Sequence, residues 1–456
     1  MRSKDGGPLA GLVCILFSAG LTAGLLGCGG TADKPADKPV TSPKSGGSGI
    51  EHIVVIVQEN RTPDNLFHGL RGADIAGVGM NSAGEIIPLT PAKLALPYDL
   101  GHSHAAFVAM YNGGKMDGAD RIGIQCQPKE PNCPPANAQF QYVDPAEVQP
   151  YFEMAEQYTF ADRMFQTNQG PSFAAHQFVI AGTSAPPATS DLFAAENVGF
   201  PPNAGSNMEA GCAGPTGETV AMIDPMGNES STQFPCFEHQ TLLDLLDSHG
   251  ITWRYYAPST GSIWTAPNAI QHLRYGNDWQ NVIIPQTKVL TDIANGQLAQ
   301  VTWVIPDGRA SDHPNVTDGS GPSWVASVVN AIGNSAYWAN TAILITWDDW
   351  GGWYDHVAPP ILNSYEYGFR VPLIVVSPYA KRGYVSHTMH DFGSLLRFTE
   401  ETFHLPSLGY ADSRADDLSD CFDFTQAPMT FQPFVAKYDA SHFLNDTRAP
   451  LDPDDD

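Results

Sequence analysis

Basic residues are scarce in this sequence. Its 456 residues include 23 Lys and Arg against 49 Asp and Glu, which gives a formal net charge of −26 at pH 7. Proteins that bind nucleic acids generally present a basic face, so this balance argues against a nucleic-acid partner. An anionic small substrate stays compatible with the charge, because a bound metal ion can dominate the field of a local site.

Long apolar runs are also few. The prominent one, residues 11–26, lies at the N-terminus and is too short for a comfortable membrane span. It runs into Leu25-Leu26-Gly27-Cys28, which resembles the lipobox of bacterial lipoproteins. We expect residues 1–28 to be a lipoprotein-type signal peptide with Cys28 as the lipidated residue, and residues 29–49 to be a disordered tether. These segments predict an exported protein that a lipid anchor holds at the bacterial cell envelope, and a plain secretory signal or short anchor is the alternative.

Cysteine is sparse, with seven residues in all. Their spacing lacks the pattern of zinc ribbons and fingers, which argues against a thiolate metal site. Cys126 with Cys133, and Cys212 with Cys236, are candidate disulfides and would suit an oxidising compartment. The sequence does not fix the pairing, and with this pairing Cys421 would stay reduced.

No internal repeat is present, and strand-like segments alternate with longer helix-like ones. This alternation predicts an α/β fold with helices on both faces of a parallel or mixed sheet. The predicted strands are residues 53–58, 158–161, 252–255, 301–305, 342–347 and 371–377, and the predicted helices are residues 150–157, 173–181, 239–249, 324–332 and 392–402.

The composition, 42% hydrophobic, allows a sizeable core. We expect one large domain at residues 50–436 and an acidic tail at residues 437–456. Two long loops rich in Gly, Pro and Asn, residues 69–100 and 183–235, are expected to form a cap over a site.

Two predicted strands end in pairs of oxygen ligands, Glu59-Asn60 and Asp348-Asp349. Open α/β sheets build their sites beyond the carboxyl ends of their strands, so these side chains can converge on one divalent cation. A metal would also relieve the repulsion between the adjacent carboxylates. Ordinary polar residues at strand ends are the alternative for each pair. For Asp348-Asp349 a solvated acidic turn is a further alternative, and the flanking Trp347, Trp350 and Trp353 argue against it.

Gly170-Pro171-Ser172 leads into a predicted helix. Ser172 would stand at the helix N-terminus, where backbone N–H groups and the helix dipole favour an anion. We interpret Ser172 as a nucleophile whose hydroxyl pKa a metal lowers, and a simple N-cap is the alternative. The segment is not the Gly-x-Ser-x-Gly turn of α/β-hydrolases.

Several histidines lie in or near these segments. His102 and His313 sit in loops, and as a pair beside a phosphate they would bind its oxygens or protonate a leaving group. Each alone is also compatible with a surface residue that has no role. We expect His104, His176 and His356 to surround and support the metal ligands.

Together these segments resemble the bacterial phosphoesterase family that contains haemolytic and non-haemolytic phospholipases C and respiratory-burst-inhibiting acid phosphatases. The resemblance covers residues 50–425 in order and rests on residues 52–67, 99–104, 112–118, 170–176, 306–314, 324–325, 346–360 and 418–424. It implies an alkaline-phosphatase-like three-layer α/β/α sandwich. It further implies one divalent metal ion held by Glu59, Asn60, Asp348, Asp349 and Ser172.

The resemblance also implies a two-step mechanism. Ser172 attacks phosphorus and expels an alcohol, and water then hydrolyses the phosphoserine, while His102 and His313 contact the phosphate or the leaving group. Two departures concern substrate fit: Ala174-Ala175 precedes His176 where many members have Pro-Asn, and His104 stands where an aromatic residue is usual. The Cys/Ser-x-Pro-x-Arg segment of related sulfatases is absent, which argues against sulfatase activity.

The expected substrate is a phosphate ester, either a monoester as for an acid phosphatase or a phospholipid as for a phospholipase C. The sequence leaves no room for the extra C-terminal β domains of larger haemolytic phospholipases, which favours an acid-phosphatase-like or short phospholipase C enzyme. Two alternatives belong to other classes. A metal-free serine esterase would use Ser172 with His313 and an Asp, and its activity would survive a chelator. A non-catalytic surface lipoprotein would not need the nucleophile and the candidate ligands, all of which are present in the sequence.

Overall fold

A computed structural model describes residues 49–202 and 209–451, and all of these belong to one compact unit. The predicted signal peptide at residues 1–28, with Cys28, and all but the last residue of the predicted tether at residues 29–49 lie outside the described residues. Among the helices described, none is both long enough and apolar enough to cross a bilayer.

The core is an eight-stranded mixed sheet with the order β14-β13-β15-β1-β16-β17-β8-β18. β1 pairs in parallel with both β15 and β16, whereas β17 runs antiparallel to β16 and β8. The strands are β1 His52–Gln58, β8 Thr159–Ala161, β13 Trp253–Tyr256, β14 Val282–Ile283, β15 Val301–Val304, β16 Thr341–Trp347, β17 Leu373–Val376 and β18 Tyr384–Ser386.

The two central strands are buried on both faces. Every residue of β16 is buried, as is every residue of β1 after His52. Continuous runs of β-branched and aliphatic residues are typical of strands that helices cover on both sides, which is why these segments were recognisable in the sequence. Their register sets Gln58 opposite Trp347, so the residues that follow each strand start side by side.

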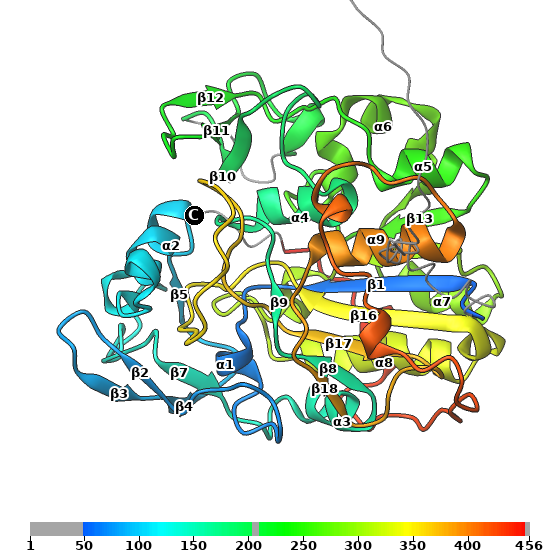
Figure 1. Ribbon diagram of the computed structural model, residues 1–456, viewed down its shortest axis with the longest axis horizontal. Coiled ribbons are helices and arrows are strands. Elements are labelled where there is room, and N and C mark those ends of the chain that lie inside the picture. Colours follow the sequence, from blue (N-terminus) through cyan, green and yellow to red (C-terminus); the bar gives the residue numbers. More distant parts are fainter. Residues whose placement is uncertain (1–48, 203–208, 452–456) are drawn as a thin grey trace, which may run out of the picture. The chain divides into compact units, whose positions relative to one another are not determined.

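Helices cover both faces of the sheet, and Figure 1 shows α4, α5 and α9 on one side of β1 and β16, with α3 and α8 on the other. α4 packs against both α5 and α9, and α8 packs against α3, α7 and α10. The helices are α3 Gln149–Gln157, α4 Ser172–Ala181, α5 Leu242–Ser248, α7 Lys288–Ala294, α8 Gly321–Gly333, α9 Phe392–Phe403 and α10 Ala440–Leu444. The predicted three-layer α/β/α architecture is confirmed.

The segments expected to be long loops contain small sheets and helices of their own. The first includes β2 Val78–Met80, β3 Ile86–Pro88, β4 Thr90–Ala92 and β5 Tyr98–Leu100, followed by α2 His104–Tyr111. The second includes β10 Phe193–Gly199, β11 Thr219–Ile223 and β12 Ser231–Gln233. Smaller elements are α1 Pro63–Leu66, β6 Ile124–Cys126, β7 Gln141–Val143, β9 Met164–Phe165, α6 Gln271–Tyr275 and β19 His390–Asp391.

The compact unit continues past residue 436, where we drew the domain boundary. Phe443 in α10 is buried and its ring lies 5.3 Å from that of Trp324, centroid to centroid. Further along, Arg309 Nη1 donates to the carbonyl of Ala449 at 2.9 Å. Residues 437–451 are therefore part of the domain. The apolar contact of Phe443 with Trp324 holds this segment against α8, and the acidic residues at its end take no part in that contact.

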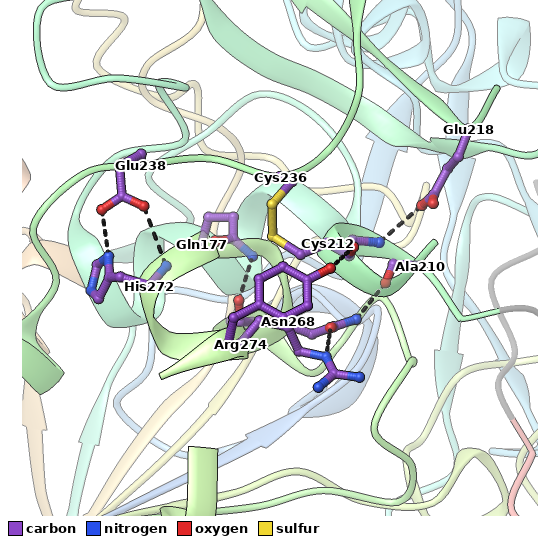
Figure 2. The surroundings of a disulfide bond; sticks show 12 residues. Gln177, Ala210, Cys212, Glu218, Cys236, Glu238, Asn268, His272 and Arg274 are labelled. Atoms are coloured by element: carbon purple, nitrogen blue, oxygen red, sulfur yellow. Dashed lines mark hydrogen bonds and ion pairs between the residues drawn. A yellow bond between two sulfur atoms is a disulfide. The ribbon is translucent and has the colours of Figure 1, made fainter. Parts of the chain in front are cut away.

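Both candidate disulfides are present, Cys126–Cys133 and Cys212–Cys236, and Cys421 is buried and reduced. Figure 2 shows that Cys212–Cys236 lies among polar contacts that tie the β10–β12 region to α6. Arg274 Nε donates to Asn268 Oδ1 at 2.9 Å, and the Asn268 amide donates to the carbonyl of Ala210. The disulfide thus joins the segment before β11 to the segment after β12.

Candidate active site

The two predicted ligand pairs lie together at the carboxyl ends of β1 and β16. The backbone amides of Asn60 and Asp349 both donate to Asp348 Oδ1, at 3.0 and 2.7 Å. Asn60 adopts a left-handed conformation, φ 62°, which turns the chain immediately after Glu59. Glu59, Asn60, Asp348 and Asp349 are all fully buried.

Ser172 begins α4 directly beside these acids. Its Oγ donates to Asp349 Oδ2 at 3.2 Å, and the next backbone amide, of Phe173, donates to Asn197 Oδ1 at 2.9 Å. Gly170 permits the close approach of β10, because a Cβ there would lie 2.1 Å from the carbonyl oxygen of Ala195. The helix N-terminus and its serine are therefore fixed against the acidic cluster.

His176 lies one turn further along α4 and joins the same cluster. Its Nε2 is 3.2 Å from Glu59 Oε1 and 3.9 Å from Asp348 Oδ2. Potential ligand atoms of these three side chains all lie within 4.8 Å of one another. We predicted a supporting role for His176, and its distance from the two carboxylates also suits direct coordination.

The donor set fits a divalent cation. Within residues 49–202 and 209–451, the buried atoms Asp348 Oδ2 and Asn60 Oδ1 have no hydrogen-bond partner, although buried polar atoms are normally paired. The neighbouring cation, Arg61, faces away and donates to the carbonyl oxygens of Asp312 and Leu94. Glu59, Asp348 and Asp349 lie together in a buried cluster, and a divalent metal ion held by their oxygens and the His176 imidazole would balance this concentration of negative charge.

His102 lies beside the cluster, and His313 lies next to His102, with the two ring centroids 6.1 Å apart. His102 Nδ1 lies 2.8 Å from the carbonyl oxygen of Leu100, to which it donates a hydrogen bond. Its Nε2 points to the site, 3.4 Å from Asn60 Nδ2 and 4.0 Å from Asp349 Oδ2. His313 Nε2 lies 3.8 Å from Asp99 Oδ2. Both rings are fully buried, and His313 is held by Asn315, whose Oδ1 lies 3.0 Å from its Nδ1.

His356 is not where we expected it. It bonds to Asp64 at 2.8 Å and Asp74 at 3.1 Å, and it adjoins Arg370. Arg370 in turn binds Asp355 at 2.8 Å, so these residues form a separate buried ion network. Proximity to Asp349 in the sequence misled the prediction, because Gly351 and Gly352, both at positive φ, turn the chain away from the acids.

His104 forms hydrogen bonds with two glutamates of the second long loop segment. Its Nδ1 is 2.5 Å from Glu229 Oε1, and its backbone amide donates to Glu196 Oε1 at 3.0 Å. Burial, with the nearby Glu229 carboxylate, raises the pKa of Glu196 to about 7. Neither glutamate is predictable from sequence, since both lie in the segment expected to form a cap loop.

A buried network beneath His313 also escaped prediction. Asp312 Oδ2 accepts hydrogen bonds from Tyr151 Oη at 2.7 Å and Trp347 Nε1 at 3.2 Å. Burial raises the pKa of Asp312 to about 6, and its backbone is left-handed at φ 73°. Its place in the Ser311-Asp312-His313-Pro314 segment was the only available signal, because its partners come from distant parts of the sequence.

Comparison with known proteins gives a consistent result. Residues 50–406 match the model of the Phosphoesterase family. The chain is 22% identical to phospholipase C B of Mycobacterium tuberculosis, over 84% of this chain and 80% of that protein. It is 24% identical to the non-hemolytic phospholipase C of Pseudomonas aeruginosa, over 86% of this chain and 59% of that protein.

Among solved structures, a protein of the alkaline phosphatase superfamily from Vibrio parahaemolyticus matches 82% of this chain with 72% of its own, at 10% identity and a TM-score of 0.36. The match to the family model covers well over half of the sequence and is therefore sufficient to assign the family. The chain belongs to the phosphoesterase family and is a phosphoric ester hydrolase.

Proposed function

We propose that this enzyme hydrolyses phosphate esters through a metal-dependent phosphoserine mechanism, with Ser172 as the nucleophile. The observation that carries the proposal is the position of the Ser172 hydroxyl, at a helix N-terminus and 3.2 Å from one of the buried carboxylates. The helix N-terminus favours the negative charge of a phosphoryl group. The ligand residues would be Glu59, Asn60, Asp348, Asp349 and Ser172, joined by His176.

The bound metal ion would act as a Lewis acid toward the phosphoryl oxygens and would lower the pKa of the serine hydroxyl. In the first step, Ser172 Oγ forms a bond to phosphorus while the ester P–O bond breaks, and Asp349 Oδ2 is placed to take the serine proton. The departing alcohol needs a proton, which His102 or His313 would give. In the second step, water attacks phosphorus, the bond to Ser172 Oγ breaks, and inorganic phosphate or a phosphomonoester leaves.

The substrate is a phosphomonoester or a phosphodiester of the phospholipid kind. The relatives named phospholipase C support the diester, while the resemblance to acid phosphatases supports the monoester. Two soluble substrates, p-nitrophenyl phosphate and p-nitrophenylphosphorylcholine, distinguish these possibilities.

The test is turnover of both substrates with and without a chelator, by the native protein, Ser172→Ala and Ser231→Ala. Ser231 is exposed on β12 and provides the matched control, which should keep full activity. We expect turnover to vanish with the chelator and in Ser172→Ala, and acid-quenched enzyme to carry phosphate on Ser172 alone. Activity that survives both treatments would contradict the mechanism.

We also propose that the mature protein is a lipoprotein of the cell envelope, on the basis of Leu25-Leu26-Gly27-Cys28. Cys28→Ser should release the enzyme from the membrane fraction of expressing cells after an alkaline carbonate wash, which removes proteins held only by peripheral contacts. Retention of that variant in the membrane fraction would remove the basis for the anchor.

A further inference from the structure

Exposed apolar side chains gather on two loop tips that touch each other. Met226, at the turn between β11 and β12, is 86% exposed, and Leu362 and Ile361, between β16 and β17, are 52% and 38% exposed. Ser364 Oγ donates to the carbonyl oxygen of Asp224 at 2.8 Å, which joins the two tips. We call Met226, Ile361 and Leu362 the apolar rim.

Both tips continue into the wall of the active site. On one loop, the Tyr365 hydroxyl donates to the carbonyl of Ala195 at 3.0 Å and lies 2.8 Å from where a Cβ of Gly170 would stand, two residues before the nucleophile. On the other, Glu229 binds His104. Figure 1 shows the segment before β17, coloured yellow, between α2 and the β10–β12 sheet.

A third element adds to this surface. Val108 of α2 is 54% exposed and follows His104 by one helical turn, so it lies on the same side of the helix. Apolar side chains exposed singly need no explanation, but a group of them around a catalytic site indicates a surface that is covered during function.

The scarcity of basic residues around the apolar rim indicates which type of lipid surface it would contact. The sequence contains no Lys or Arg between Arg163 and Arg254, nor between Arg309 and Arg370, and these two segments carry the rim and the site wall. Arg414 reaches the loop that carries Leu362, but it is paired with Glu366 at 2.7 Å. Attraction to anionic lipids depends on clustered basic residues, and a single paired arginine is not such a cluster. Acidic residues such as Glu229 are instead compatible with the outward ammonium groups of zwitterionic lipids.

We propose that the apolar rim inserts into the surface of a zwitterionic phospholipid bilayer and holds the mouth of the active site against the head groups. Shallow insertion of a few apolar side chains is how peripheral proteins bind neutral interfaces. This inference rests on the proposed function, since a phosphodiesterase acting on phospholipid must reach a phosphate at that depth. The rim would make the enzyme faster on bilayers than its activity on soluble esters indicates.

The experiment uses residues 47–456, the compact unit, so that the N-terminal segment does not contribute to binding. Binding to phosphatidylcholine vesicles is measured by flotation for the native unit, Met226→Asp/Leu362→Asp, and Val435→Asp. Val435 is 78% exposed and follows Phe434, which packs on Phe431 near the start of β16, so it is an exposed apolar control far from the mouth. Turnover of p-nitrophenylphosphorylcholine and a melting curve are recorded for each.

We expect the double variant to bind vesicles about tenfold more weakly or worse, with Val435→Asp unchanged. Soluble turnover and melting temperature should be unchanged in both, which separates loss of docking from misfolding.

Equal vesicle binding by the double variant, or no binding by the native unit, would overturn the inference. Loss of a native dimer in the double variant would assign the rim to a second copy of the chain instead. Absence of soluble turnover in the native unit would count against the proposed function, independently of vesicle binding.

Discussion

The acidic side chains of the site are compatible with one another only when a positive charge lies among them. Glu59, Asp348 and Asp349 are fully buried within one cluster, where like charges interact through a low effective dielectric constant. Asp348 is the most suitable residue for testing this repulsion, because its Oδ2 has no hydrogen-bond partner among the described residues that a substitution would remove.

Asp348→Asn tests it directly. Asparagine keeps an Oδ1 acceptor for the amides of Asn60 and Asp349 while it removes one charge. In chelator, the free energy of unfolding should rise by about 1–2 kcal/mol, because one repulsive charge is gone. Turnover with metal should fall about a hundredfold or more. Urea unfolding in chelator, with metal content by elemental analysis, checks both, and an unchanged or lower stability of the variant would show that the acids are not in conflict.

Asp312 offers a second test, with a defined pH dependence. Its folded pKa of about 6 lies above an unfolded value of about 3.9, so the native state binds the proton more tightly and stability is lost as pH rises from about 4 to 6. Asp312→Asn keeps the left-handed backbone and an acceptor for Tyr151, and should be more stable than the native protein at pH 8 by about 1–3 kcal/mol. Asp312→Ala leaves that hydroxyl without its acceptor and should cost about 2–4 kcal/mol. Urea midpoints at pH 4 and pH 8 measure the difference, and equal pH profiles for Asp312→Asn and native protein would refute it.

At the scale of residues, the sequence predicts those site residues whose side chains suit the chemistry and which directly follow a recognisable strand or begin a recognisable helix. Glu59-Asn60 and Asp348-Asp349 follow recognisable strands, and Ser172 precedes a recognisable helix, so topology alone brings them together. Glu196 was not foreseeable, since it reaches His104 only through the fold of a cap segment that resembles a loop. His356 shows the opposite error, in which nearness in sequence was taken for nearness in space.

Elements on the α5 side of the sheet are held together by a titratable contact. His272 of α6 lies between Asp244 of α5, at 2.8 Å, and Glu238, at 2.7 Å, and Figure 2 shows its pairing with Glu238. The hydrogen bond to Asp244, aided by Glu238, raises the pKa of His272 to about 9. The stability from this contact is fully present below the unfolded pKa of about 6.5 and is lost as pH rises through about 9.

His272→Gln should therefore lower the free energy of unfolding at pH 6 by about 1–2 kcal/mol, a value reduced for the partial exposure of the ring, and should have no effect at pH 10. His249→Gln is the control, because the His249 ring bonds to Ser248 and the carbonyl of Leu245 instead of a carboxylate. Urea unfolding at the two pH values gives the result, and an equal loss at both would mean that the ring contributes packing rather than charge.

The elements that build the sheet were predictable, and those that build the cap were not. β1 and β16 are long and buried on both faces, so their composition is unambiguous. β2, β3 and β4 have three residues each and are largely exposed, so neither alternation nor apolar content separates them from a loop. The chain beyond residue 436 was misread for a similar reason: the single buried aromatic of α10 is outweighed by the surrounding acidic residues.

At the scale of the whole molecule, the site draws its residues from widely separated parts of the chain. Glu59 follows β1, Ser172 and His176 belong to α4, and Asp348 follows β16, so no ligand set exists until the sheet and its helix layer have assembled. A metal bound there would bind the folded state and not the unfolded one, which couples its affinity to the stability of the entire domain.

Titrating the chelated protein with divalent ions should consequently raise the free energy of unfolding by RT ln(1 + [M]/Kd), about 2.7 kcal/mol at one hundred times Kd. Both probes should report the same shift in a single unfolding transition, because the proposed ligands come from the central strands of the sheet and from the helix α4 that covers it. Thermal unfolding followed by both tryptophan fluorescence and far-UV circular dichroism checks the size and the cooperativity of the shift. Asp348→Asn serves as the comparison and should respond much less to the metal. If metal restored turnover without changing the melting temperature, the ion would be bound at the surface of the site and not by the buried carboxylates that join β1, α4 and β16.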